Sequence, residues 1–104
     1  MKEIKAFIRP EKLNKLADHL KKEKFCCFTV FEGEGVGKYA DPKTKFPSLK
    51  HPFLHNKVVK LEIVCDKEDV DNIVKIIKDF AQTGEPGDGL IYVSTVDQKI
   101  RVRD

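Results

Sequence analysis

Hydrophobic residues alternate with other residues at the start of the chain, where Ile4, Ala6 and Ile8 share one face. This period of two is typical of a β-strand with one buried face, and Pro10 marks its end. The apolar positions then change to a spacing of three and four among charged residues, which predicts an amphipathic helix of about four turns. The apolar stripe of this helix comprises Leu13, Leu16, Ala17 and Leu20.

The next two predicted strands flank a long segment without regular periodicity. The first covers residues 28–31, and the glycines that follow it, Gly33, Gly35 and Gly37, are predicted to end it. The second covers residues 58–65 and places its odd-numbered residues on one face and its even-numbered residues on the other.

A second helix and a further strand follow. Asp66 is a candidate N-cap, and apolar residues at helical spacing within residues 70–81 predict a helix that ends before Gly84. Residues 91–96 predict a fourth strand, and residues 100–102 a short fifth one. Two successive βαβ units predict an α+β, ferredoxin-like fold, in which an antiparallel sheet carries both helices on one face.

Residues 38–55 contain three prolines and four lysines, and no single regular element accommodates them. Loops of this length in compact domains usually have a function, so this one is a candidate contact arm. In the alternative interpretation, its apolar residues pack back on the body of the domain. Those apolar residues are Phe46, Leu49, Phe53 and Leu54.

The composition agrees with one small domain and argues against several classes of protein. The chain has 104 residues, of which 36% are charged, and a net charge of only +3, so the charges are mixed and form no field for nucleic acid. No apolar run reaches the length of a membrane span, and residues 1–10 lack the apolar core of a signal peptide. Three cysteines without CxxC spacing favour a reducing compartment. We therefore expect a cytoplasmic protein that is not embedded in a membrane.

A glycine-rich turn and two arginines within residues 83–104 indicate phosphate binding. Gly84, Gly87 and Gly89 permit backbone conformations in which successive N–H groups converge on an anion. Arg101 and Arg103 lie two apart on an extended segment, so both guanidinium groups can bind one phosphate. A glycine-containing turn alone is most often a plain connection, and the order of the pieces carries the signal.

The order TGEPGDGLIYV followed by IRVR resembles the signature of the PII nitrogen-regulatory signal-transduction family, to which MKEIKAFIRPEKL and KVVKLEIV are also similar. The resemblance covers residues 1–104 as a single PII-like domain, with residues 38–56 as its T-loop, 83–90 as the phosphate-binding turn and 97–104 as the C-terminal segment. It implies a homotrimer that binds an adenine nucleotide (ADP, AMP or ATP) in the clefts between subunits. It also implies that the T-loop regulates a partner protein, such as a membrane transporter or a metabolic enzyme.

The resemblance assigns roles to individual residues as well. In the family, two arginines reach the phosphates from the neighbouring subunit, and they correspond to Arg101 and Arg103. The loop around the phosphates, in which the aspartate shapes the turn, corresponds to Gly87, Asp88 and Gly89. The base of the T-loop corresponds to Gly35, Gly37 and Lys38. The adenosine end corresponds to Thr29, Glu62 and Val64. The T-loop residues expected to contact the partner are Phe46, Leu49, Lys50 and Phe53.

Four positions depart from the family pattern near the far phosphates. Leu90 stands where the family usually has a lysine, and Val58 replaces another lysine, although Lys57 is adjacent. Lys38 replaces an arginine, which keeps the charge and loses the bidentate geometry. Tyr39 replaces a glutamine that, together with the second lysine, helps to bind magnesium with 2-oxoglutarate. These replacements predict that ADP or AMP competes well with ATP and that 2-oxoglutarate has little effect.

The same fold is compatible with three other functions. An RNA-recognition module needs exposed aromatic residues on its third strand, and KVVKLEIV has none. An enzyme needs a nucleophile or a general base in a cleft, and no such arrangement stands out, so a sensor is favoured over a catalyst. The alternative kept open is transition-metal binding, through His51 and His55 with Cys26, Cys27 and Cys65. Cys26 and Cys27, adjacent on a strand, are expected to point to opposite faces, which argues against a site there.

Overall fold

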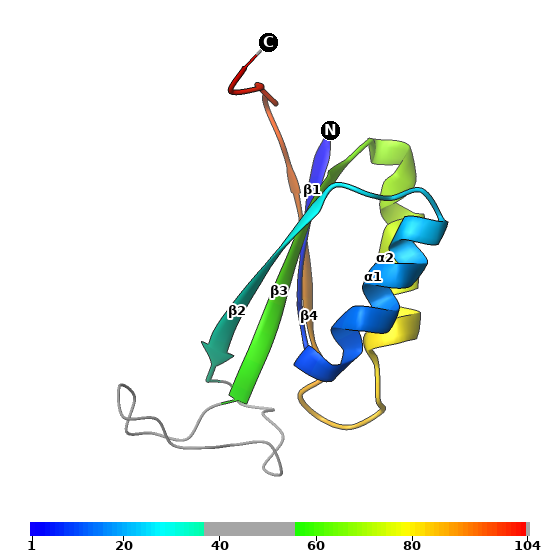
Figure 1. Cartoon of the computed structure of the whole chain (residues 1–104), viewed down its shortest axis with the longest axis vertical. Helices are drawn as coiled ribbons and strands as arrows, with labels where there is room; N and C mark the ends of the chain where they lie inside the picture. The colour runs from blue at the N-terminus through cyan, green and yellow to red at the C-terminus, as the bar shows by residue number, and fades with distance from the viewer. Residues whose placement is uncertain (37–55, 104) are drawn as a thin grey trace.

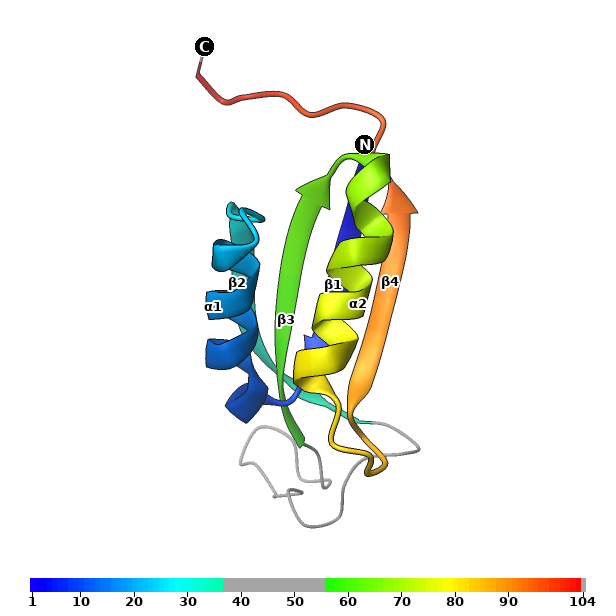
Figure 2. The ribbon, with the colours of Figure 1, turned by 90° about the vertical axis from the view of Figure 1, so that its right-hand side faces the viewer.

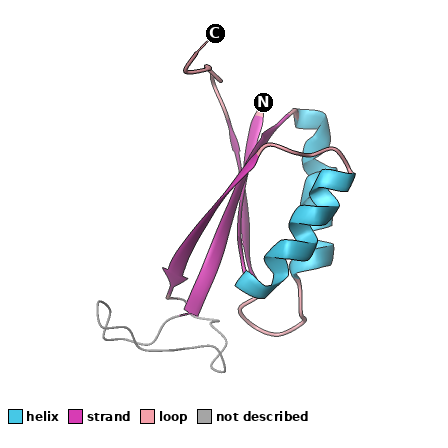
Figure 3. Ribbon diagram, in the orientation of Figure 1, coloured by secondary structure: helices cyan, strands magenta, loops and turns pink. Residues whose placement is uncertain are grey.

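Four strands and two helices make up residues 1–36 and 56–103, which are the residues that this computed structural model describes. Figures 1 and 2 show one sheet with both helices packed on the same face, and Figure 3 shows the opposite face without a helix. In chain order the elements are β1 (Lys2–Ile8), a 3₁₀ turn (Pro10–Lys12), α1 (Leu13–Lys22), β2 (Phe28–Gly35), β3 (Asn56–Cys65), a second 3₁₀ turn (Lys67–Asp69), α2 (Val70–Ala81) and β4 (Gly89–Thr95).

The sheet is antiparallel and has the strand order β2-β3-β1-β4. β1 lies between β3 and β4, so that Ile4 faces Ile63 on one side and Val93 on the other. This confirms the predicted α+β, ferredoxin-like arrangement with two helices on one face. Within the described residues, neither helix has the length and apolar character that crossing a bilayer requires.

The first helix begins at a proline and ends in a glycine-free cap. Pro10 stands at the start of the 3₁₀ turn, where its missing N–H group is not needed. At the other end, Lys24 adopts a left-handed conformation with a φ of 66°, and its N–H donates to the carbonyl oxygen of Lys21 at 3.0 Å. The N–H of Phe25 donates to the carbonyl oxygen of Leu20 at 2.8 Å, which completes a Schellman motif.

The second helix starts without the side-chain cap predicted at Asp66. The backbone carbonyl oxygen of Asp66 accepts a hydrogen bond from the N–H of Asp69 at 3.0 Å, whereas the Asp66 carboxylate makes no cap hydrogen bond. Asp66 is therefore the N-cap residue of the 3₁₀ turn that leads into the helix, whereas the N-cap of α2 itself is Asp69. The end of α2 at Ala81 agrees with the predicted end before Gly84.

One hydrophobic core fills the space between the helices and the sheet. Alternate residues of β1 and β3 enter it, as their period of two predicts, and Leu16 and Leu20 of the predicted stripe enter it from α1. The buried core residues are Ile4, Ala6, Ile8, Leu16, Leu20, Val59, Leu61, Ile63, Ile73, Ile76, Ile77 and Ala81.

β2 is longer than its sequence predicts. It continues through Gly33 to Gly35, because β3 provides a pairing partner for each glycine. Gly33 pairs with Val58, and Gly35 pairs with Asn56. A Cβ atom added at Gly35 would lie 3.0 Å from Cγ1 of Val58, so the two strands are close at this position. Glycine weakens a strand, and here the facing strand still pairs with it.

The short fifth strand predicted at residues 100–102 does not form. β4 pairs with β1 up to Thr95, and the N–H of Val96 donates to the carbonyl oxygen of Met1 at 3.1 Å. Beyond that bond no strand of the described chain lies beside the segment, and an extended backbone becomes a strand only where a neighbour pairs with it. Figure 1 shows these residues leaving the sheet as a loop, and the side chain of Ile100 is 79% exposed.

The face of the sheet away from the helices, here called the open face, carries hydrophobic side chains. In the strand registers, one row across the open face consists of Phe31, Lys60, Phe7 and Leu90. Phe31 is 48% exposed and Leu90 is 62% exposed. Tyr92 is also exposed, and its ring meets that of Phe7 edge-on with the centroids 5.9 Å apart. Apolar side chains gathered on one exposed face mark a surface suited to contact with another molecule.

Candidate functional site

The turn between α2 and β4 is the predicted phosphate-binding turn, and its glycines have the backbone angles that this role needs. Gly84, Gly87 and Gly89 have φ values of 87°, 91° and 125°, a region that side-chain-bearing residues rarely adopt. Gly89 is also sterically constrained, because an added Cβ would lie 1.8 Å from the carbonyl oxygen of Phe7, whereas one added at Gly84 would have no atom within 4 Å. The turn lies at the same end of the sheet as the end of β2 and the start of β3 (Figure 1).

Asp88 holds this turn together from inside. Its carboxylate accepts hydrogen bonds from the N–H of Thr83 at 2.7 Å, from the Thr83 hydroxyl, and from the N–H of Gly84 at 3.0 Å. The N–H of Glu85 in turn donates to the Thr83 hydroxyl oxygen at 3.1 Å. The first two N–H groups of the turn therefore bind Asp88 and are not available to an anion, which leaves Gly87 and Gly89 as the part that can approach a phosphate.

Arg9 ties the turn to the end of β1. Its side chain is only 10% exposed, and its Nε lies 3.1 Å from Oδ1 of Asp88. Its Nη2 donates to the carbonyl oxygen of Pro86 at 3.0 Å. The sequence alone does not identify Arg9 as a site residue. The only local signal is a charged residue placed directly after the apolar end of a strand, and that pattern does not identify a partner 79 positions away.

The hydrogen bonds around Asp88 keep its carboxylate charged. Partial burial raises the pKa of Asp88. The hydrogen bonds from the Thr83 hydroxyl, from the N–H groups of Thr83 and Gly84, and from Arg9 lower the pKa by a larger amount. Their combined effect brings the pKa of Asp88 from 3.8 to about 2. Asp88 is therefore ionised at neutral pH and stabilises the turn through these hydrogen bonds.

The residues predicted for the adenosine end lie together on the open face. Thr29 of β2 faces Glu62 of β3 directly, and Val64 lies two residues further along β3. Oε1 of Glu62 forms an ion pair with Nζ of Lys60 at 2.9 Å, and that ammonium lies 4.7 Å from the ring centroid of Phe31. The three predicted residues thus form a small polar and apolar cluster beside an exposed aromatic ring.

The predicted phosphate residues are not brought together in a single chain. Arg101 and Arg103 follow the end of β4, whereas the glycine turn precedes its start, so the two groups lie at opposite ends of the sheet (Figure 1). Thr29 and Gly35 lie six residues apart on β2, which corresponds to about 20 Å along a strand. One chain therefore presents two separate halves of the predicted site.

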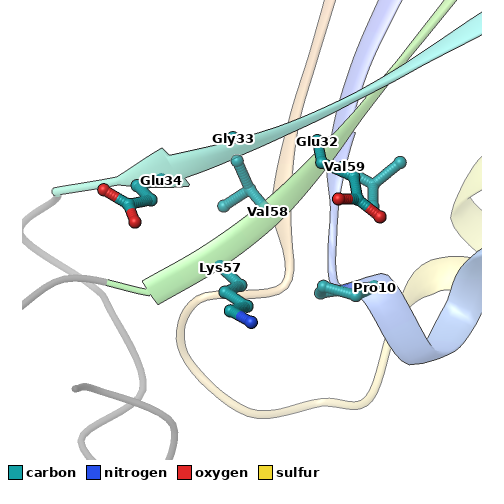
Figure 4. A pocket seen from close by; sticks show the side chains of 7 residues that line it. All are labelled: Pro10, Glu32, Gly33, Glu34, Lys57, Val58 and Val59. Carbon is teal, nitrogen blue, oxygen red and sulfur yellow. The ribbon is translucent and has the colours of Figure 1, made fainter. Parts of the chain in front are cut away.

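A hollow of about 690 Å³ lies beside the glycine turn, where the end of β2 and the start of β3 extend past the start of α1 (Figure 4). Val58 faces Gly33 and lies on the open face, whereas Lys57 is adjacent in β3 and therefore points to the other side of the sheet. Figure 4 shows the two side chains leaving β3 in different directions. Lys57 is thus not in position to replace a lysine at position 58. The residues lining the hollow are Pro10, Glu32, Gly33, Glu34, Lys57, Val58 and Val59.

Comparison with known proteins agrees with this architecture. The family model described as "Nitrogen regulatory protein P-II" matches residues 1–104. The chain belongs to the PII family. It is 39% identical to nitrogen regulatory protein P-II 2 of Methanothermobacter thermautotrophicus, over 99% of this chain and 90% of the relative. It is 36% identical to nitrogen regulatory protein P-II of Porphyra purpurea and 33% identical to that of Rhizobium meliloti, in each case over 99% of this chain and 92% of the relative.

Membership in the PII family carries a signalling role. PII proteins are signal-transduction regulators that bind adenine nucleotides and act on partner proteins. Several residues with predicted roles lie outside the described parts of the chain. They are Gly37, Lys38, Phe46, Leu49, Lys50, His51, Phe53 and His55, and their roles remain predictions.

Two cysteines of this PII protein are arranged differently from the prediction. Cys26 and Cys27 precede β2, and their Sγ atoms lie 3.4 Å apart. The prediction that they point to opposite faces is wrong, because Cys27 has a φ of 75° and is not part of an extended strand. In residues 1–36 and 56–103 no three histidine, cysteine or carboxylate side chains are grouped as metal ligands, so these residues provide no support for a transition-metal site.

Proposed function

We propose that this PII protein is a non-catalytic sensor that binds adenine nucleotides in clefts between three copies of the chain. The separation of the glycine turn from the arginine segment is the observation that carries this proposal. A nucleotide phosphate can meet Gly87 and Gly89 together with Arg101 and Arg103 only if the two groups come from different chains. The adenosine end of the nucleotide then contacts Thr29, Glu62 and Val64.

The open face supports the proposed trimer. Phe31, Leu90 and Tyr92 remain exposed on it in the single chain, and no described element covers them. A chain of this size buries a modest fraction of its surface, so covering such a face adds stability. Light scattering at micromolar concentration should give the mass of three chains. A stable monomer would contradict both the assembly and the nucleotide site between subunits.

The side chains expected near the terminal phosphates of ATP argue against a strong preference for ATP over ADP and AMP. Leu90 lies on the open face directly after the glycine turn and provides no charge, and Val58 provides none on the same face. Lys57 points to the other side of the sheet and does not compensate. Each missing charged partner corresponds to about 1.5–3 kcal/mol of binding free energy. ADP and AMP are therefore expected to compete effectively with ATP.

Isothermal titration calorimetry with AMP, ADP and ATP tests the nucleotide proposal, with GTP as the control for the base. Dissociation constants of ADP and ATP within a factor of ten of one another are the expected result. ATP binding a hundredfold more tightly than ADP would refute the argument from Leu90 and Val58. The combination of 2-oxoglutarate and magnesium should leave the ATP affinity unchanged, and a clear increase would mean that other residues replace the missing lysine and glutamine.

The T-loop is the proposed route to the partner protein, a membrane transporter or a metabolic enzyme. Gly35 pairs with Asn56, so the end of β2 and the start of β3, which flank residues 37–55, lie side by side. A nucleotide at the base of the loop can then bias the loop between arrangements through differential contacts. Deletion of residues 44–52 should preserve the trimer and nucleotide affinity while abolishing capture of the partner. Capture that survives the deletion, or that does not depend on the nucleotide, would contradict this role.

A further inference from the structure

We propose that Cys26 and Cys27 form a two-thiol binding site for a trivalent metalloid of the arsenite class. Both thiols are exposed, and their Sγ atoms are 3.4 Å apart. Consecutive residues in an extended segment direct their side chains to opposite sides, so this convergence needs a special backbone conformation. Cys27 has that conformation, with a φ of 75°.

The positive φ of Cys27 is a separate feature from the helix cap that precedes it. Lys24 also has a positive φ, and its conformation is explained by the Schellman hydrogen bonds that end α1. Cys27 lies beyond that motif and immediately before Phe28, the first residue of β2. A backbone conformation that a side-chain-bearing residue rarely adopts is a reason to look for function where it places reactive groups. Here it places two sulfur atoms side by side.

The distance between the sulfurs selects the kind of ion. An ion bonded to both at about 2.3 Å, the usual length of a thiolate–zinc bond, would have an S–ion–S angle of about 95°. Two-coordinate copper(I) and mercury(II) favour a linear arrangement, and zinc requires a tetrahedron with four ligands. The described residues provide no group of three such ligands. Trivalent arsenic is pyramidal with bond angles near a right angle, so it matches the pair.

Binding balances without an oxidant or a reductant. An organoarsenical oxide, R–As=O, reacts with the two thiols to give R–As(S–Cys26)(S–Cys27) and one water molecule. Arsenic remains trivalent, both S–H bonds are broken, and the two protons leave in the water. Cys26, through its hydrogen bond and its charge, raises the pKa of the Cys27 thiol, whereas the ammonium of Lys99 lowers it.

A disulfide between the two cysteines is the competing outcome. Adjacent Cα atoms are about 3.8 Å apart, which is below the range of ordinary disulfides at about 4.4–6.8 Å, so the ring would be strained and easily reduced. Its formation also requires the sulfurs to approach from 3.4 Å to about 2.05 Å. Chelation leaves the sulfurs where they are, and for this reason we favour it.

Titration of the reduced protein with phenylarsine oxide tests the site, with intact mass and free-thiol counts as readouts. The chain has three cysteines, so binding of one arsenical should leave one free thiol, and none in the control variant Cys65→Ser. Cys26→Ser and Cys27→Ser should each weaken binding by roughly a hundredfold or more, because the second bond is no longer intramolecular. Their far-ultraviolet circular dichroism should match the wild type, since both positions are exposed.

The same titration in urea shows whether tight binding requires the folded backbone or only two cysteines adjacent in the sequence. The folded protein should bind the arsenical more tightly than the unfolded chain, because the positive φ of Cys27 holds the sulfurs together in advance. Equal affinities would overturn the proposal. So would a single-cysteine variant that binds as tightly as the wild type, or a reduced protein that forms a Cys26–Cys27 disulfide and takes up no arsenical.

Discussion

Nε of Arg9 lies 3.1 Å from Oδ1 of Asp88, and this ion pair joins the end of β1 to the glycine turn 79 positions later. The arginine side chain is nearly buried and the aspartate is partly buried. Asp88 also binds both N–H groups at the start of the turn. The turn is therefore shaped by the protein itself, so a phosphate would meet a preformed loop and would not have to order it.

The pH dependence of stability should report on Asp88. Its folded pKa of about 2 is below the ordinary value of 3.8, so the carboxylate stabilises the fold fully above the unfolded pKa. That contribution is lost as the pH falls from about 4 towards 2, and a shift of this size corresponds to about 2 kcal/mol. Urea unfolding of Asp88→Asn should show a loss of about 2 kcal/mol at pH 7 and a flatter acid limb. The exposed Asp97→Asn is the matched control, and equal acid limbs in wild type and Asp88→Asn would contradict the assignment.

Alanine substitutions in the turn should separate backbone strain from a steric clash. Gly89→Ala places a Cβ 1.8 Å from the carbonyl oxygen of Phe7 and should lower the free energy of unfolding by about 3 kcal/mol or more. Gly84→Ala has no atom within 4 Å of the added Cβ and should cost only about 1 kcal/mol, from its positive φ. Denaturant unfolding measures both. Similar losses in the two variants would mean that β4 shifts to accommodate the methyl group.

Restoring a lysine after the glycine turn should restore a preference for ATP. Leu90 is 62% exposed, so Leu90→Lys introduces an ammonium group without emptying the core. We expect the ATP affinity to rise about tenfold relative to that of AMP, which corresponds to one charged hydrogen bond. Calorimetry with both nucleotides measures the ratio, and Leu90→Gln controls for side-chain length. An unchanged ratio would place the terminal phosphates away from residue 90.

Two defective variants should complement one another in mixed trimers if the site is shared between chains. Gly87→Glu repels phosphate at the turn, and Arg101→Ala with Arg103→Ala removes the arginine segment, so each homotrimer should bind nucleotide poorly. When equal amounts are unfolded and refolded together, about a quarter of the clefts should combine an intact turn with an intact arginine pair. The number of sites found by calorimetry decides the question. No recovery in confirmed mixed trimers would indicate that both halves act within one chain.

Local patterns in the sequence are sufficient to predict the four strands, the two helices and their order. The period of two in β1 and β3 and the stripes of α1 and α2 correspond to the buried residues, because the side chains of a strand or a helix repeat with the period of its own backbone. The sequence also identifies the glycines of the turn, and their positive φ values show why glycine is required there. Each of these features depends only on neighbouring residues.

The remaining features depend on partners that are distant in sequence or on backbone angles that side-chain identity does not specify. The burial of Arg9 depends on Asp88, and the continuation of β2 through Gly33 depends on pairing with β3. Residues 100–102 have the pattern of a strand but no neighbouring strand in the described chain. The φ of Cys27 reverses the expected direction of its side chain. A sequence sets the period of each element, whereas the partners that satisfy its polar groups become known only when the chain is folded.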